Sequence, residues 1–219
     1  MLRGEETKGQ RGEELNAFSV LLLSLCLFAP SPLKPARRSM TKRHNPYELA
    51  FEAYLRSRQI PYVAVDETRR ALDGQRSLKS LDFIVSPAGQ GRSWLVDVKG
   101  RRFPSGRQTQ QYWKNWSTAD ELRSLASWEG LFGGQFRSLL VFAYQIVGDR
   151  APLPVDELFP FRGGLFGFVG IRLDHYAGWS HQLSARWDTV TVPAAQFRAL
   201  ARGVESFFGG PGRSAIGAA

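Results

Sequence analysis

A carboxylate and an ammonium stand two positions apart in the apolar segment WLVDVKG, residues 94–100. If this segment is a strand, alternate side chains point to opposite faces, so Asp97 and Lys99 share one face with Leu95. The other face then carries Trp94, Val96 and Val98. Burying a charged side chain without a partner is costly, so two charges on one face indicate a charged ligand or a metal ion.

A second carboxylate precedes this segment. Asp82 lies in LDFIVSP, residues 81–87, which has the character of a strand, and the glycines of the linking residues 88–92 favour a hairpin loop. In such a hairpin, Asp82 lies beside Asp97 and Lys99 if register and twist bring them together. Two carboxylates from neighbouring strands would supply the oxygen ligands that a hard divalent cation prefers. A lysine one pleat along would place an ammonium beside a bound water or phosphate.

An acidic helix is expected upstream, within residues 44–60. Asn45 is a candidate N-cap, Pro46 suits the first helical position, and Glu48 stands three residues after the cap. Glu48 fits a capping box as well as it fits an acidic ligand, and both interpretations stay open. Glu52, one turn later, is the alternative acid.

The remaining elements must form the scaffold that positions these residues. The continuous apolar run in residues 137–147 favours a strand buried on both faces, and a capped amphipathic helix is expected over 118–132. Residues 69–80 have the composition of a polar, basic connection. Further strands are expected in residues 60–67, 166–173 and 187–193, with a closing helix over 194–208. This order indicates an α/β layered arrangement around a mixed sheet.

The helix with Glu48, followed by SLDFIV, a loop and WLVDVKG, resembles the PD-(D/E)XK nuclease superfamily, which has the restriction-endonuclease-like fold. The resemblance covers roughly residues 45–145. It implies a three-layer α/β/α core with a central mixed β-sheet. Leu81 stands where the family name has proline, a departure that many members share.

The resemblance also implies a set of site residues. Asp82 matches the first aspartate, Asp97 the acidic position and Lys99 the lysine, with Glu48 as the helical acid. Val98 would offer its backbone carbonyl to the metal. On this resemblance, Asp82, Asp97, Val98 and Glu48 bind Mg²⁺ or Mn²⁺, and Lys99 orients a water or stabilises developing charge during phosphodiester hydrolysis.

A basic cluster follows the site directly. It suits contacts with the phosphates of a nucleic acid, although a solvated charged surface explains it almost as well. Its members are Arg101, Arg102, Arg107 and Lys114.

Composition narrows the class of protein. The chain of 219 residues has a net charge of +9 and a pI near 10.1, which favours a polyanionic partner. Cys26 is the one cysteine, which excludes an internal disulfide and a thiolate zinc cage and fits a reducing cytoplasm. No membrane association is expected of the domain.

The first forty residues differ in character from the rest. Residues 17–30 are apolar but too short to span a bilayer comfortably, and the glutamates before them are unlike the positive start of a signal peptide. We expect residues 1–40 to be a disordered leader or the product of a misassigned start, with Met40 as the true one; a signal or anchor is the alternative. We expect one nuclease-like domain over 41–209, with a core at about 45–147 and an extension at about 148–209. Residues 210–219 have the composition of a disordered tail.

The function expected from the sequence is that of a metal-dependent nuclease acting on DNA, with RNA as an alternative, in repair, recombination or defence. The competing hypothesis is a non-catalytic nucleic-acid-binding or scaffold protein that retains the fold. The sequence leaves open whether cleavage is endonucleolytic or exonucleolytic, and whether the protein forms a homodimer.

Overall fold

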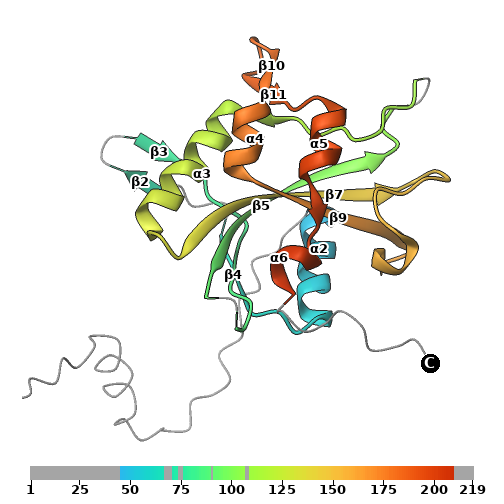
Figure 1. The fold of residues 1–219 in the computed structure, drawn as a ribbon, viewed down its shortest axis with the longest axis horizontal. Helices are drawn as coiled ribbons and strands as arrows, with labels where there is room; N and C mark the ends of the chain where they lie inside the picture. The colour runs from blue at the N-terminus through green and yellow to red at the C-terminus, as the bar shows by residue number, and fades with distance from the viewer. Residues whose placement is uncertain (1–44, 67–70, 74–75, 90, 107–108, 210–219) are drawn as a thin grey trace, which may run out of the picture. The chain divides into compact units, whose positions relative to one another are not determined.

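The structure, a computed structural model, describes residues 45–66, 71–73, 76–89, 91–106 and 109–209 (Figure 1). The predictions for the leader, for Met40, for Arg107 and for the tail 210–219 lie outside these residues. None of the helices in the described ranges is long and apolar enough to cross a membrane.

Two long strands form the centre of the sheet. β5 (Ser93–Phe103) and β7 (Phe136–Ile146) run parallel and pair along their whole lengths, from Ser93 with Phe136 to Phe103 with Ile146. β9 (Gly164–Arg172) covers the other edge of β7 in antiparallel orientation. Because β7 is enclosed by strands on both edges and by helices on both faces, its apolar run is buried, as the sequence predicts.

The outer strands complete a mixed sheet in the order β1-β4-β5-β7-β9-β12, with β8 pairing to β9. β4 and β5 are antiparallel neighbours, which confirms the predicted hairpin. β9 belongs to the predicted C-terminal extension and yet lies next to the central strand, so the extension is part of the same sheet. The bounds of the outer strands are Tyr62–Ala64 for β1, Phe83–Val85 for β4, Phe159–Phe161 for β8 and Arg202–Gly203 for β12.

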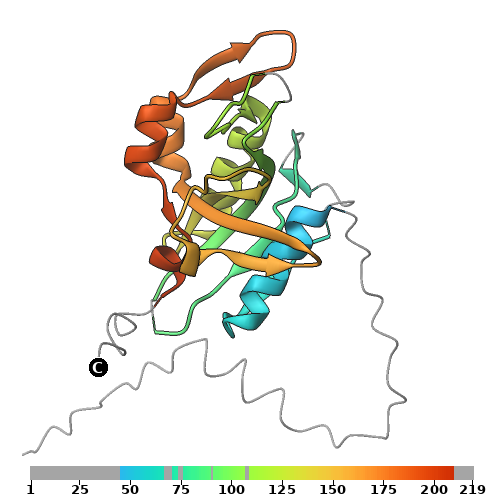
Figure 2. The ribbon, with the colours of Figure 1, turned by 90° about the vertical axis from the view of Figure 1, so that its right-hand side faces the viewer.

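Helices cover both faces of this sheet. On one face α2 (Pro46–Ser57) and α6 (Glu205–Phe208) pack through Phe51, Tyr54 and Phe208 onto Val96 and other strand residues. On the opposite face lie α3 (Ala119–Phe132), α4 (Leu173–Trp179) and α5 (Ala194–Leu200). Figure 2 shows α2 and the pair α4 and α5 on the two sides. The prediction of a three-layer α/β/α core around a mixed sheet is therefore confirmed.

The two helices nearest the site begin as their sequences predict. In α2, Asn45 caps the helix by accepting from the Tyr47 N–H at 3.1 Å, and Pro46 occupies the first turn. In α3, Thr118 and Glu121 form a capping box, and Leu125 is buried against the sheet. These caps fix where each helix starts and therefore where its first-turn acid lies.

Two predicted elements differ from the structure. The connection 69–80 contains a short antiparallel pair, β2 (Ala71–Asp73) with β3 (Arg76–Leu78). The single helix expected over 194–208 is divided into α5, β12 and α6, because Arg202 and Gly203 pair with Gly170 and Val169 at the edge of β9. Strand pairing at the sheet edge outweighs local helical preference there.

A second, small sheet supports the start of α3. β10 (His181–Ser184) and β11 (Thr189–Thr191) form a hairpin, and β11 pairs with β6 (Ser117–Thr118). The backbone N–H of Ala119 also donates to the Asp188 carbonyl at 2.8 Å. The first turn of α3 is thus held from a segment about seventy residues later in the chain.

Candidate functional site

The site forms where β5 continues beyond the end of β4. The strand pairing of β4 ends at Phe83, which lies opposite Val96, and Asp82 adds one more backbone bond from its N–H to the Val96 carbonyl at 2.9 Å. β5 runs on to Phe103. Because backbone groups alternate between strand edges, the N–H and C=O of Val98 point to the same edge as those of Val96, which β4 no longer covers.

Asp82 occupies this uncovered edge. Its Oδ2 accepts a hydrogen bond from the Val98 N–H at 2.6 Å, and Asp82 directly precedes β4, whose first residue Phe83 lies opposite Val96. Both aspartates are almost fully buried, at 5% and 8% exposure. The hairpin therefore places both aspartates at the lining of one cavity, with Asp82 bonded to the Val98 N–H and Asp97 paired with Lys99.

Asp97 and Lys99 lie on one face of β5, while Val96 and Val98 pack into the core of the other face, as the alternation predicts. Lys99 Nζ lies 2.7 Å from Asp97 Oδ2 and 3.0 Å from Glu121 Oε1. Burial alone would lower the pKa of the Lys99 ammonium, but the carboxylates of Asp97 and Glu121 outweigh it and raise that pKa above its ordinary value. Lys99 is thus held as a cation.

Glu121 belongs to the site although the sequence did not single it out. Its Oε2 accepts from the Thr118 N–H at 2.9 Å and from the Ser117 hydroxyl at 2.8 Å, which leaves Oε1 for Lys99. Burial alone would raise the pKa of the Glu121 carboxyl, but Lys99 and the two hydrogen bonds lower it to about 2. The sequence at 118–121 fits a capping box, but this pattern does not predict that the Glu121 side chain also contacts Lys99 on a strand.

Glu48 reaches the site from the first turn of α2. It is 4% exposed, and one carboxylate oxygen accepts from the Asn45 side-chain amide. Glu52 is placed differently, since its carboxylate accepts from Tyr62 at 2.9 Å and pairs with Arg56 at 2.6 Å on the helix surface. Of the two helical acids that the sequence left open, Glu48 is the one at the site.

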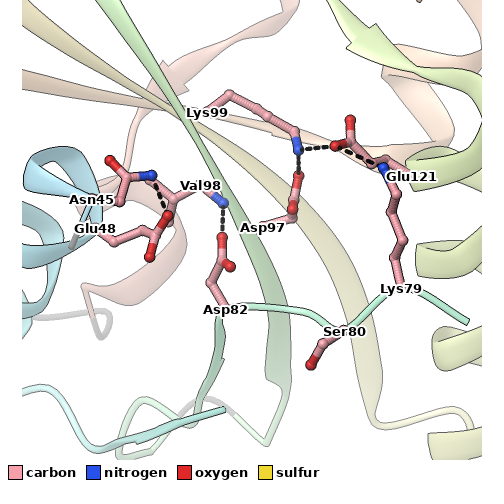
Figure 3. A pocket seen from close by; sticks show the side chains of 9 residues that line it. All are labelled: Asn45, Glu48, Lys79, Ser80, Asp82, Asp97, Val98, Lys99 and Glu121. Carbon is pink, nitrogen blue, oxygen red and sulfur yellow. Dashed lines mark hydrogen bonds and ion pairs between the residues drawn. The ribbon is translucent and has the colours of Figure 1, made fainter. Parts of the chain in front are cut away.

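These side chains enclose one cavity of about 360 Å³ (Figure 3). It lies between α2, the end of β4, the free edge of β5 and the start of α3. Lys79 contributes a second ammonium, 3.5 Å from Glu121 Oε1, and its backbone is fixed to α3 by a bond from its N–H to the Ser124 hydroxyl. The lining residues are Asn45, Glu48, Lys79, Ser80, Asp82, Asp97, Val98, Lys99 and Glu121.

The donors at this cavity suit a hard divalent cation by type. Asp82, Asp97 and Glu48 offer carboxylate oxygens, and the Val98 carbonyl points to the same strand edge. In this conformation, no three His, Cys, Asp or Glu side chains of the described residues gather closely enough to surround one ion. The carboxylates instead accept from Val98, Lys99 and Asn45, so binding an ion would replace part of these contacts.

The predicted basic cluster is spread over several environments. The Arg101 guanidinium donates to the Gly100 carbonyl at 2.7 Å and to the Trp116 carbonyl, and lies 4.0 Å from the centre of the Trp116 ring. Burial lowers the pKa of this guanidinium below its ordinary value. Arg102 and Lys114 are exposed. Arg101 thus fastens a loop to β5, whereas Arg102 and Lys114 are open to a partner.

Comparisons with known proteins give a structural neighbour. No family model and no curated protein sequence matches the chain. Among solved structures, the chain is similar to the 1.6 Å structure of Hjc, a Holliday junction resolvase from the archaeal hyperthermophile Archaeoglobus fulgidus. The identity is 12%, the match covers 74% of this chain and 98% of that chain, and the TM-score is 0.44. Since a likeness this distant does not determine an activity, the chemistry of this chain is inferred from its own cavity.

Proposed function

We propose that this chain is a divalent-metal-dependent nuclease that hydrolyses phosphodiester bonds in DNA. One observation carries the proposal. Asp97 and Lys99 come from β5, Asp82 directly precedes the adjacent strand β4, Glu48 comes from a helix on one face of the sheet, and all four line the same cavity. Such a combination of buried acids and a lysine is the chemistry that metal-assisted phosphoryl transfer needs.

Each residue has a distinct role in this proposal. Asp82, Asp97, Glu48 and the Val98 carbonyl would hold Mg²⁺ or Mn²⁺, and the bound ion would acidify a water and polarise the phosphoryl oxygen. Lys99 acts as a cation rather than as a base, because its pKa is raised by the carboxylates beside it. Its ammonium stabilises the charge that develops on the phosphate or orients the attacking water.

The charge of the cavity explains why a cation would be needed before the substrate. Among the described residues, four carboxylates and two ammonium groups line it, namely those of Glu48, Asp82, Asp97 and Glu121 against Lys79 and Lys99. With these groups in their ordinary charge states the lining is net negative, so it repels a phosphodiester until a divalent ion is bound. Arg102 and Lys114, which lie outside the cavity, would contact the flanking phosphates, and we propose the same role for Arg107 from its place in the sequence.

Repair, recombination or defence in the cytoplasm is the setting that we propose, with DNA as the substrate and RNA as the alternative. The test is to incubate purified protein with supercoiled plasmid, single-stranded DNA, a four-way junction and RNA, in Mg²⁺, in Mn²⁺ and in EDTA. We expect cutting that depends on the metal. Asp97→Asn and Lys99→Met should each lower kcat by about 10²–10³-fold while the thermal unfolding curve stays cooperative.

The controls decide between enzyme and binding protein. Glu129→Gln removes a carboxylate from α3 that lies outside the cavity, where it pairs with Arg137 at 3.5 Å, and it should leave cutting unchanged. Cutting that persists in both Asp97→Asn and Lys99→Met would place the activity elsewhere. Metal-independent binding of nucleic acid with no cutting of any substrate would support the non-catalytic alternative.

A further inference from the structure

The Lys99 ammonium lies between carboxylates from two different elements. Asp97 is on the same strand, with its Oδ2 at 2.7 Å, and Glu121 comes from the first turn of α3, with its Oε1 at 3.0 Å (Figure 3). Lys99 is only 12% exposed, so it relies on these partners more than a surface lysine would. The two partners, however, have different tasks in the proposed reaction.

The Asp97 carboxylate cannot neutralise Lys99 fully while it also binds a metal ion. If a divalent cation took the Asp97 carboxylate as a ligand, that carboxylate would neutralise the Lys99 ammonium less, and the two positive centres would repel each other. A buried ammonium whose partner is withdrawn either turns away or opposes the binding of the ion. A second carboxylate beside Lys99 removes this conflict.

Glu121 is built to be that second partner. Its Oε2 is fixed by the Thr118 N–H and the Ser117 hydroxyl, so the carboxylate cannot rotate away without losing both bonds. Its Oε1 faces Lys99 and, at 3.5 Å, the more exposed ammonium of Lys79. The segment that carries it is held by the pairing of β6 with β11.

We propose that Glu121 is a positioning residue that holds the Lys99 ammonium in place while Asp97 binds the catalytic cation. This inference rests on the proposed function and deepens it, since it adds to the cavity a residue that acts through Lys99 rather than on the metal or the phosphate. It distinguishes Glu121 from an ordinary capping residue. A capping box accounts for the contacts of Oε2 alone, whereas Oε1 crosses to a strand residue 22 positions away in the sequence.

The chain offers a well-matched control on the same helix. Glu129 also pairs through one oxygen with a cation, Arg137 at 3.5 Å, and accepts a backbone N–H, that of Ser138 at 2.7 Å, through the other. It does not line the cavity. Glu121→Gln and Glu129→Gln therefore remove the same charge from one helix, in each case from a carboxylate that pairs with a cation and accepts a backbone N–H. Glutamine also suits the third position of a capping box, so Glu121→Gln keeps the helix start intact.

The experiment measures the affinity for Mg²⁺ and Mn²⁺ by titration calorimetry, without DNA, in the wild type and in four variants. These are Glu121→Gln, Glu129→Gln, Lys99→Met and the double variant Lys99→Met with Glu121→Gln. We expect Glu121→Gln to weaken ion binding by about 10–100-fold, the size of the effect of residues that orient metal ligands. Glu129→Gln should leave ion binding unchanged. In the Lys99→Met background, adding Glu121→Gln should change the ion affinity little further, because the ammonium that Glu121 positions is already absent.

Cleavage assays supply a second readout. Glu121→Gln should lower kcat while the KM for DNA changes little, since in this proposal Glu121 acts through Lys99 and not on the DNA. Equal ion affinities in wild type and Glu121→Gln would overturn the inference. So would a loss of affinity of the same size with and without Lys99, because Glu121 would then act on the ion directly.

Failure of the two proposals is distinguishable. A wild type that binds neither ion and cuts no substrate overturns the proposed function and the inference together. A wild type that binds an ion and cuts, with a double-variant cycle that is additive, overturns the role of Glu121 alone.

Discussion

The carboxylate of Asp82 accepts the backbone N–H of Val98 at 2.6 Å, on the edge of β5 that β4 leaves uncovered. This contact does two things at once. It gives a buried backbone donor its partner, and it holds the Asp82 carboxylate beside the Val98 carbonyl, which points to the same edge. A strand edge and an acidic side chain thereby form one oxygen-rich corner of the cavity.

Two substitutions at Asp82 separate these effects. Asp82→Asn keeps an oxygen that can accept from Val98 and removes the charge, so we expect near-normal stability and a loss of kcat of about 10²–10³-fold. Asp82→Ala also leaves the Val98 N–H without this acceptor, which should cost about 1–3 kcal/mol in the free energy of unfolding. Urea denaturation and cleavage rates measure the two effects. Equal stability of both variants would show that the hydrogen bond contributes little.

The two glutamates of α2 provide a test of the helical acid. Glu48 lines the cavity, whereas Glu52, one turn later, pairs with Arg56 and Tyr62 outside it. We expect Glu48→Gln to weaken Mn²⁺ affinity and to lower kcat about tenfold or more, in the range seen when carboxylates around a metal are removed. Glu52→Gln should change neither. A greater loss in Glu52→Gln, measured by calorimetry and cleavage, would reverse the assignment.

The sequence predicted the parts of this site that depend on local rules. Alternation along a strand placed Asp97 and Lys99 on one face, and the hairpin placed Asp82 at the cavity that they line. Neither rule predicts which helix residue will contact which strand residue. Glu121 is 22 residues beyond Lys99 and on a different element, and its contact depends on how α3 crosses the sheet. The same limit explains the division of the closing helix, because only the folded sheet reveals the edge that β12 covers.

Gly100 determines how closely the start of α2 approaches β5. A side chain at this position would overlap the ring of Tyr47, which lies in the same helical turn as Glu48. Gly100→Ala should therefore push the start of α2 outward, destabilise the fold by about 1–3 kcal/mol as overpacking does, and lower activity by displacing Glu48. Gly130→Ala on α3 is the control, since a Cβ there meets open space. Thermal unfolding and cleavage assays on both variants would detect the difference, and equal behaviour would contradict it.

Lys79 is the more exposed of the two ammonium groups that line the cavity, and we expect it to contact the proposed substrate. It is 36% exposed at the cavity, with one ion pair to Glu121 at 3.5 Å, and Arg137 is 37% exposed with one ion pair at the same distance outside the cavity. If Lys79 binds a phosphate, Lys79→Gln should weaken duplex binding and reduce the slope of log affinity against log salt by about 0.9. Arg137→Gln should leave that slope unchanged. Fluorescence anisotropy at several salt concentrations, in Ca²⁺, measures the slope for each variant. An unaltered slope in Lys79→Gln would show that Lys79 does not contact the nucleic acid.

The pKa of Glu121 makes a prediction about stability in acid. Since Lys99 and two hydrogen bonds lower this pKa from 4.5 to about 2, the folded state binds a proton at Glu121 less readily than the unfolded chain does. The resulting stabilisation is present above about pH 4.5 and is lost as the pH falls toward 2, and it amounts to up to about 3 kcal/mol. In EDTA, the difference in unfolding free energy between wild type and Glu121→Gln should therefore be constant from pH 7 to 5 and shrink below pH 4.5. Urea denaturation at each pH measures it, and a difference that is the same at pH 3 and pH 7 would mean that the Glu121 carboxylate gains no stability from Lys99.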